Sequence, residues 1–239
     1  MVFVDFSNPY LRAHLAGGYC DGHRRTLDNA RARLGEWAAS STLKERKAAA
    51  VQGRAPRPLA VVLDIDEVLL CNFHMNSFRA AAGVQGDEPV DFHAGDFFAA
   101  PGGGPWPRSE RRLNPLLPGA YPLLEETRRL GLEIFLLTGR LESIRDETVE
   151  NLEFVGLAGT PPGALLPLGA LRAPGGALIM CPDAEYPPPG ASVRPFKEAR
   201  RRAVEKTHRI VLNIGDQVSD LGLHGDVQVH CAHPYYYTP

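Results

Sequence analysis

Long hydrophobic runs and an excess of charge of one sign are both missing from this chain of 239 residues. No apolar run approaches the roughly 18 residues that a membrane-spanning helix needs. The 26 basic and 28 acidic side chains leave a net charge of −2, so no global field favours nucleic acid or an anionic membrane as a partner. We therefore expect a protein that acts in solution, with neither a nucleic acid polymer nor a membrane as its partner.

Cysteine is scarce, and its spacing excludes two further classes. The four cysteines, Cys20, Cys71, Cys181 and Cys231, lie far apart, and no Cys-x-x-Cys pair is present. A zinc ribbon or a thioredoxin-like redox motif is therefore not indicated. Two disulfides are arithmetically possible. Free and mostly buried thiols are favoured, because a chain of this length buries a sizeable core without covalent bridges.

An export signal is not visible either. Asp5 and Arg12 fall where a signal peptide has its apolar stretch. We expect a cytoplasmic protein, with an exported form whose signal has been removed as the alternative.

Three short apolar runs are present, and each ends in a polar residue. Residues 59–63, 132–137 and 210–214 are rich in Val, Leu and Ile, which is typical of strands buried on both faces. Asp64 follows the first run and Thr138 the second, while Gly-Asp follows the third. A further strand is expected at 177–180.

Helical patterns lie before and between these runs. Residues 24–52 carry apolar side chains at helical spacing and predict one or two helices. Three more helices are expected at 119–130, 142–155 and 195–207. Strands that alternate with helices predict an α/β fold, a Rossmann-like parallel sheet with helices on both faces. Ligands of such sheets bind beyond the carboxyl ends of the strands, so the polar strand ends should converge on one crevice.

Two segments fall outside this alternation. We expect residues 1–58 to form a helical extension packed on a core of residues 59–239. Residues 71–118 are rich in glycine and aromatic residues, and they are expected to form a cap insertion over the crevice. Most of the cap aromatics should pack on one another. Phe73 and Phe78 are the candidates for stacking on a nucleobase or an aryl leaving group.

Pairs of aspartates mark two of the strand ends. Asp64 and Asp66 are separated by one residue, and Asp216 and Asp220 lie four apart. Carboxylates crowded after buried strands are costly unless a positive charge lies among them. Oxygen-only ligands suit Mg²⁺, so the sequence predicts a magnesium site.

The other two candidates are a hydroxyl, Thr138, and a lysine at a helix start, Lys197. A carboxylate can attack phosphorus, and a second carboxyl nearby can protonate the leaving oxygen. A hydroxyl, a lysine and Mg²⁺ can bind the phosphoryl oxygens, where charge is concentrated in the transition state. The four groups together therefore indicate phosphoryl transfer.

These motifs, in this order, resemble the haloacid dehalogenase (HAD) superfamily, and within it the plant and bacterial class B/C acid phosphatases. The resemblance spans nearly the whole chain and is weakest across 74–112 and 157–190. Two positions depart from close relatives: Val68 stands where Thr is common, and Val218 where Trp is frequent. The resembling segments are VVLDIDEVLLCN (61–72), LPGAYPLLEETRRLGLEIFLLTGR (117–140), ETVENLEFVG (147–156), FKEARRR (196–202), NIGDQVSDL (213–221), HPYYYTP (233–239) and GGYCDGHRR (17–25).

The resemblance implies a HAD-like core and a role for each candidate. Asp64 would be the nucleophile and Asp66 the general acid/base, while Thr138 and Lys197 would bind phosphate. The implied Mg²⁺ ligands are Asp64, the backbone carbonyl of Asp66, Asp216 and Asp220.

The function expected is therefore a Mg²⁺-dependent phosphomonoesterase that acts on a small-molecule phosphomonoester through an aspartyl phosphate. The alternative is a non-catalytic phosphate-binding, storage or signalling protein built on the same fold. Asp66 favours the enzyme, because a domain that only holds phosphate has no use for an acid/base at that position. A homodimer is possible.

Two further clusters have unremarkable explanations. Arg200, Arg201 and Arg202 could attract phosphate, but a solvated helix face is favoured. His230, Cys231 and His233 lack a fourth ligand at a usual spacing, so a soft-metal site is not favoured.

Overall fold

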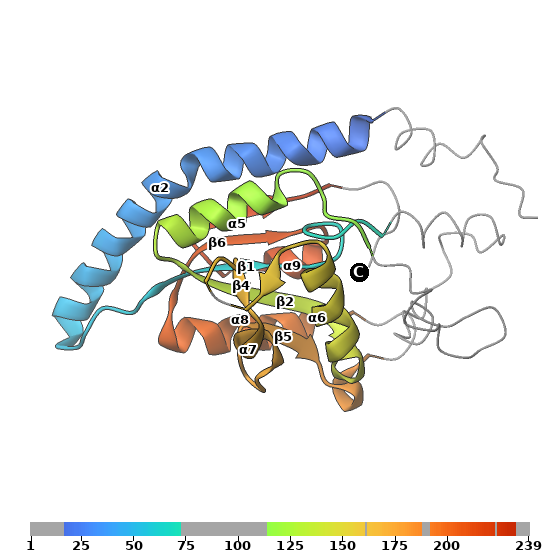
Figure 1. Cartoon of the computed structure of the whole chain (residues 1–239). Helices are drawn as coiled ribbons and strands as arrows, with labels where there is room; N and C mark the ends of the chain where they lie inside the picture. Colours follow the sequence, from blue (N-terminus) through green and yellow to red (C-terminus); the bar gives the residue numbers. More distant parts are fainter. Residues whose placement is uncertain (1–16, 73–113, 161, 188–191, 223, 233–239) are drawn as a thin grey trace, which may run out of the picture.

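The computed structural model describes residues 17–72, 114–160, 162–187, 192–222 and 224–232. A five-stranded parallel sheet lies between two layers of helices (Figure 1). This architecture confirms the predicted α/β class. In sheet order the strands are β5 (Leu178–Cys181), β2 (Glu133–Leu141), β1 (Leu59–Leu63), β6 (Arg209–Gly215) and β7 (Val227–His230).

The central strands form where the apolar runs predict them. β1 lies in the middle of the sheet, with β2 on one side and β6 on the other. Its residues 60–63 are buried, as are residues 210–215 of β6. The register pairs Leu63 with Leu136 of β2 and with Ile214 of β6. The three strands therefore end close together, and the residues that follow them lie side by side.

One long helix, α2 (Gly18–Gln52), covers one face of the sheet together with α5 (Ala120–Arg129). Leu27, Ala30 and Leu34 are buried along the face of α2 that packs on the core. The helix begins six residues before the predicted start and is uninterrupted. At Gly119, just before α5, an added Cβ would lie 2.9 Å from the Leu27 Cβ, so the absence of a side chain lets the two helices meet.

The opposite face is covered by α8 (Arg194–Thr207), which contacts both β2 and β6. The remaining elements are short, apart from α6. They are η2 (Glu142–Ile144), α6 (Arg145–Phe154), the paired strands β3 (Ala158–Gly159) and β4 (Leu166–Pro167), α7 (Leu168–Arg172), η3 (Asp183–Glu185) and α9 (Val218–Leu221).

The end of one strand and the presence of another differ from the prediction. β2 does not end at Leu137 but continues to Leu141, because Leu141 pairs with Cys181 of β5 after an irregularity in the register. The edge strand β7 was not predicted. Its sequence, VQVH, alternates half-buried and exposed residues and carries too few apolar side chains to stand out.

The cap prediction falls almost entirely on residues 73–113, which lie outside the described residues, as do Phe73 and Phe78. The chain on either side of this segment is paired. Leu70 and Leu116 form an antiparallel bridge, and the Cys71 amide donates to the Pro115 carbonyl at 2.9 Å. The two ends of the segment therefore lie side by side on the core.

The four cysteines are free, and Cys71, Cys181 and Cys231 are buried, in agreement with the interpretation as unpaired thiols. Among the described residues, no helix combines the length and the hydropathy that crossing a bilayer requires.

Candidate active site

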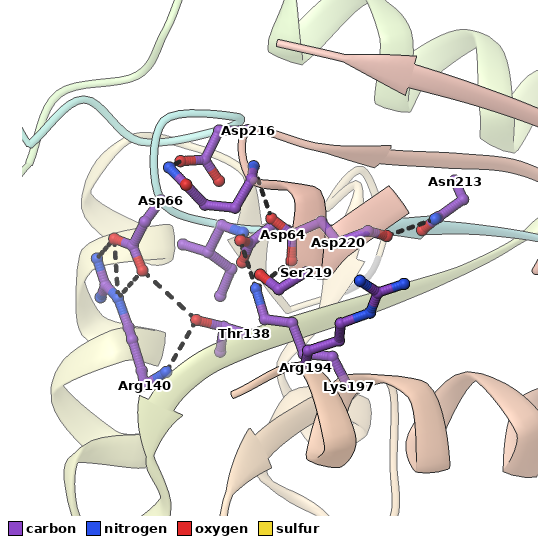
Figure 2. Close-up of polar contacts among 12 residues, drawn as sticks. Asp64, Asp66, Thr138, Arg140, Arg194, Lys197, Asn213, Asp216, Ser219 and Asp220 are labelled. Carbon is purple, nitrogen blue, oxygen red and sulfur yellow. Dashed lines mark hydrogen bonds and ion pairs between the residues drawn. The ribbon is translucent and has the colours of Figure 1, made fainter. Parts of the chain in front are cut away.

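The residues predicted to carry chemistry converge at the carboxyl ends of β1, β2 and β6 (Figure 2). Asp64 follows β1 directly, and Asp216 follows β6. Thr138 lies within the extended part of β2. Lys197 reaches the same place from the first turn of α8, and Asp220 from the short helix α9. The structure therefore brings the five groups together.

Three buried aspartates form the centre of this site. One carboxylate oxygen from each of Asp64, Asp216 and Asp220 lies within 4.8 Å of the others. Burial and the neighbouring carboxylate of Asp220 raise the pKa values of Asp64 and Asp216 well above their ordinary range. The three acids resist simultaneous ionisation. A cation among them would relieve that repulsion.

Lys197 is the positive charge that the structure places there. Its Nζ donates to Asp64 Oδ2 at 2.7 Å and also forms an ion pair with Asp220. The side chain is buried, which disfavours the ammonium form, but Asp220, Asp64 and Asp216 together outweigh burial and raise its pKa. Lys197 therefore belongs to the buried site and not to the surface of α8.

The loop that carries Asp216 and Asp220 is held by hydrogen bonds among its own residues. Asp220 Oδ2 accepts the Gln217 amide at 3.0 Å, and the Gln217 side chain donates to Asp216 Oδ2 at 2.8 Å. Asp220 packs so closely over Gly215 that an added Cβ there would lie 1.9 Å from its own Cβ. A glycine before Asp216 is therefore a steric requirement of this acid pair.

Asp66 lies apart from the three-acid cluster and faces Arg140. Nη2 of Arg140 donates to Asp66 Oδ1 at 2.7 Å, and Nε donates to Oδ2 at 3.0 Å. Asn72 Nδ2 adds a third donor at 2.9 Å from Oδ1. Burial opposes ionisation of Asp66, but the guanidinium charge and these hydrogen bonds outweigh it and lower the pKa of Asp66. Its carboxylate is thus not part of the acid cluster, which leaves only its backbone carbonyl as a candidate metal ligand.

Thr138 is completely buried between Asp66 and Arg140. Its hydroxyl lies 3.4 Å from Asp66 Oδ2 and accepts the Arg140 backbone amide at 3.1 Å. The hydroxyl hydrogen is therefore directed toward Asp66 Oδ2. Such a donor suits a phosphoryl oxygen.

The turn after β1 has a strained backbone at Glu67. This residue has φ +53° although it is not glycine, and it is fully buried. Tyr19 of α2 donates a hydrogen bond to its carboxylate, and the Asn72 amide donates to Oε1 at 2.8 Å. The first turn of α2 thus helps to hold the loop that carries both Asp64 and Asp66.

Sequence reasoning missed the residues that support the site. Arg140 lies two residues after Thr138, but no role was predicted for it. Arg201 was grouped with the solvated arginines, which is wrong. It is buried, whereas the side chains of Arg200 and Arg202 are 37% and 68% exposed. Its position four residues after Lys197, one helical turn on, is the signal that would have placed it on the same inward face.

Arg201 and Asn213 of β6 together hold the loop that carries Asp216 and Asp220. Nη1 of Arg201 donates to the Ser219 carbonyl at 3.1 Å, and Nε donates to Asn213 Oδ1 at 3.2 Å. Asn213 Nδ2 donates to the Asp220 carbonyl at 2.6 Å. Nη2 of Arg201 lies 3.6 Å from Asp220 Oδ1. These contacts hold the backbone of the loop and place a positive charge beside the Asp220 carboxylate.

The His/Cys cluster near the C-terminus does not form a metal site in the described part of the chain. His230 Nε2 donates to the Asp216 carbonyl at 2.8 Å, and burial, reinforced by Asp216 and Asp220, raises the pKa of Cys231. His233 lies outside the described residues. The His230 contact instead adds support to the loop of Asp216.

The donor set fits a hard divalent cation. Among the described residues, Asp64, Asp216 and Asp220 form the one group of three close ligands, and all their donors are carboxylate oxygens. Mg²⁺ prefers such oxygens and keeps several waters. The three acids and the Asp66 carbonyl would leave room for them in an octahedral shell.

Comparisons with known proteins match most of the chain. A family model described as HAD superfamily, subfamily IIIB (acid phosphatase), matches residues 36–239. Acid phosphatase 1 of Solanum lycopersicum is 29% identical over 213 residues. The match covers 89% of this chain and 66% of that relative, so this chain spans slightly less than two thirds of the relative's length.

Two solved structures have a similar fold. The crystal structure of a class C acid phosphatase from Bacillus anthracis with tungstate bound has a TM-score of 0.60 and 21% identity, covering 97% of this chain and 86% of that one. A second structure of the class C acid phosphatase from the same organism has a TM-score of 0.51, also at 21% identity, covering 92% and 87%. At this identity the likeness shows a common fold.

Proposed function

Since the chain belongs to subfamily IIIB of the HAD superfamily, the acid phosphatases, we propose that it hydrolyses small phosphomonoesters through an aspartyl phosphate, with Mg²⁺ as its cofactor. One observation carries the proposal. Two aspartates that are two residues apart have opposite surroundings, Asp64 in the acid cluster beside Lys197 and Asp66 against Arg140. Such a separation of environments gives two carboxylates different tasks.

Asp64 is the proposed nucleophile. Its Oδ1 accepts the Ile65 amide at 2.7 Å and its Oδ2 accepts Lys197, so its orientation is fixed before substrate binds. In the first half-reaction a carboxylate oxygen of Asp64 forms a bond to phosphorus, and the bond from phosphorus to the ester oxygen breaks. In the second, a water oxygen attacks phosphorus and the bond to Asp64 breaks, which releases inorganic phosphate.

Asp66 moves the protons of both steps. It gives a proton to the leaving alcohol oxygen in the first, and it takes one from the attacking water in the second. Arg140 lowers the pKa of Asp66 in the free protein. A phosphate dianion close to Asp66 acts in the opposite direction, so substrate binding favours the protonated form that the first step needs.

Lys197 and Thr138 bind the phosphoryl group. The ammonium of Lys197 contacts Asp64, and the hydroxyl of Thr138 contacts Asp66. Both would supply donors to the equatorial oxygens, where charge is concentrated in the transition state. Mg²⁺, held by Asp64, Asp216, Asp220 and the Asp66 carbonyl, would neutralise part of this charge and offset the repulsion between the nucleophile and the phosphate.

The test is hydrolysis of p-nitrophenyl phosphate with Mg²⁺, with EDTA in its place, and by the Asp64→Asn variant. Asp28→Asn, which changes an aspartate on the exposed face of α2, is the matched control. We expect turnover that needs both the metal and Asp64, and that Asp28→Asn leaves unchanged. Full activity of Asp64→Asn would contradict the proposed nucleophile.

The same assay, together with beryllium fluoride binding, distinguishes this enzyme from the alternative of a phosphate-binding, storage or signalling protein. Folded protein that binds beryllium fluoride, a mimic of the aspartyl phosphate, but turns over no phosphomonoester would support that alternative. Turnover that depends on Asp64 excludes it.

A further inference from the structure

A line of buried amides leads from the core of the protein to Asp66. Asn72 Nδ2 donates to Asp66 Oδ1 at 2.9 Å, and Asn114 Nδ2 donates to Asn72 Oδ1 at 2.6 Å. Asn72 is completely buried, and Asn114 is 8% exposed. Buried amides are costly unless their hydrogen bonds are made, so their presence beside a candidate catalytic carboxyl needs an explanation.

The far end of the line is anchored in α6. Asn114 donates its backbone amide to Asn151 Oδ1 at 3.0 Å, and Asn151 Nδ2 donates to the Asn114 carbonyl at 2.8 Å. Asn151 is 2% exposed. This reciprocal pair fixes the backbone of Asn114, and with it the point from which the Asn114 side chain reaches Asn72.

The donors and acceptors along this line of amides can be arranged in only one direction, from Asn114 through Asn72 to Asp66. An ionised carboxylate only accepts, so Asn72 must present its NH₂ group to Asp66. Its carbonyl oxygen then points away, and Asn114 must donate to it. Asn114 therefore selects the rotamer of the Asn72 amide that serves Asp66, although it has no contact with Asp66 of its own among the described hydrogen bonds.

The two oxygens of Asp66 are left with different surroundings. Oδ1 accepts Asn72 at 2.9 Å and Arg140 Nη2 at 2.7 Å, and Arg140 Nε also lies 3.2 Å from it. Oδ2 has Arg140 Nε at 3.0 Å and the Thr138 hydroxyl at 3.4 Å. Oδ1 thus has two close donors of its own, whereas Oδ2 has only the Nε donor that it shares with Oδ1 and a hydroxyl at the limit of hydrogen bonding.

We propose that Asn72 and Asn114 are positioning residues that hold Asp66 Oδ1 as a permanent acceptor and so reserve Asp66 Oδ2 for the proton that is passed to the leaving group and taken from water. This inference rests on the proposed phosphatase function and assigns the proton transfer to one atom. Without the Asn72 donor, only Arg140 and the distant Thr138 hydroxyl orient the carboxylate, and the guanidinium draws it toward a symmetrical two-oxygen pair. The proton donor then turns away from the leaving oxygen.

The test compares two substrates of similar shape, p-nitrophenyl phosphate and phenyl phosphate. p-Nitrophenolate leaves readily without a proton, whereas phenolate needs one. We measure kcat/KM, because this quantity reports the steps up to phosphoryl transfer, for the wild-type protein and for the Asn72→Leu and Asn114→Leu variants. Leucine keeps the side-chain size and removes the hydrogen bonds. We expect kcat/KM to fall on the order of tenfold more for phenyl phosphate than for p-nitrophenyl phosphate in both variants.

The control is Glu45→Gln, which weakens a buried ion pair with Arg57 at the other end of the sheet. It lowers stability without reaching Asp66, so the ratio of the two kcat/KM values should equal that of the wild type. An equal fall for both substrates in the asparagine variants would overturn the proposal, because a purely structural role does not depend on the leaving group.

Asn114→Ser covers the case in which leucine prevents folding, since it keeps a polar side chain and admits a water into the vacated volume. It is expected to shift the substrate ratio in the same direction, and a wild-type ratio in this folded variant would overturn the proposal. Failure of the proposed function is distinguishable, because the wild-type protein would then turn over neither substrate.

Discussion

Arg140 donates hydrogen bonds to both carboxylate oxygens of Asp66, with Nη2 at 2.7 Å from Oδ1 and Nε at 3.0 Å from Oδ2. Both partners are held from other directions, Arg140 by Thr148 at 3.3 Å and Asp66 by Asn72. Residues two apart in a strand share a face, so the continuation of β2 beyond Leu137 turns Thr138 and Arg140 toward the same carboxyl. The acid/base candidate is therefore oriented by the strand that also supplies Thr138, the proposed phosphate-binding hydroxyl.

Arg140→Lys should lower kcat/KM for p-nitrophenyl phosphate about 10- to 100-fold, because lysine keeps the charge but not the planar two-oxygen contact. Arg172→Lys, at a side chain that is 55% exposed, serves as the matched control and should match the wild type. Steady-state kinetics of the two variants decide the point. Equal activity of Arg140→Lys and Arg172→Lys would contradict the role given to the guanidinium.

Arg201→Met should weaken the proposed metal site without replacing any of its proposed ligands. The change removes the donor to the Ser219 carbonyl and the charge 3.6 Å from Asp220. The supporting contacts of a metal site typically contribute about 10- to 100-fold in affinity. The Mg²⁺ concentration for half-maximal activity should therefore rise about tenfold or more.

Its neighbour supplies the control for that experiment. Arg202→Met alters a side chain that is 68% exposed on the same helix and should leave the Mg²⁺ requirement as in the wild type. An equal rise of the Mg²⁺ requirement in both variants would show that the effect comes from the overall charge of α8 and not from the buried contacts of Arg201.

Gly215→Ala should destabilise the fold strongly, because the new methyl group would overlap Asp220, whose Cβ lies 1.9 Å away from its position. Overpacking of this kind costs about 1–3 kcal/mol or more. Gly35→Ala is the matched change, since no atom lies within 4 Å of the added Cβ in the middle of α2, and alanine stabilises a helix by up to about 1 kcal/mol. Urea unfolding of both variants should give shifts of opposite sign, and similar stabilities would contradict the steric argument.

Glu45 makes stability depend on acid pH. Its side chain is 1% exposed, and hydrogen bonds from Arg57, opposed by burial and assisted by the charges of Arg57 and Arg54, lower its pKa from 4.5 to about 2. A depressed folded-state pKa stabilises the protein above the unfolded-state value, and this contribution is lost as pH falls through the folded-state value. The contribution of Glu45 should therefore be complete above pH 4.5 and decline toward pH 2.

Glu45→Gln isolates this contribution. At pH 7 the variant should be less stable by about 1.5–3 kcal/mol, the range for hydrogen bonds to charged groups. The difference from the wild type should shrink as pH is lowered from 4.5 toward 2, because protonated glutamate resembles glutamine. Chemical denaturation across this range measures it. A difference that stays constant with pH would contradict the assigned pKa.

The sequence predicts the centre of the fold well for a definite reason. β1, β2 and β6 are short apolar runs in a background of turn residues. A strand that is buried on both faces has a continuous apolar sequence, so it can be recognised without knowing which strands it pairs with. β7 could not be predicted in the same way, because an edge strand of four residues with two exposed side chains has no such pattern. The end of β2 was also missed, since Leu141 belongs to the strand only through its pairing with Cys181.

The site shows the same division. Asp64, Asp66, Asp216 and Asp220 follow apolar strands, so local chemistry marks them. Residues whose role depends on the tertiary structure escape such reasoning: Arg201 is identical in type to two solvated neighbours, and only packing separates them. The asparagines beside Asp66 come from segments far apart in the chain, and nothing in their own surroundings in the sequence indicates a common task.

The most direct test of the account is to find the phosphoryl group on Asp64. The wild-type protein is quenched with acid during turnover of p-nitrophenyl phosphate with Mg²⁺, and borohydride then reduces the acyl phosphate, which converts the labelled aspartate into homoserine. The account predicts homoserine at position 64 by mass spectrometry of the digested protein, and none after incubation without substrate. Reduction at Asp66, or at no aspartate in a sample that turns over substrate, would contradict the proposed nucleophile.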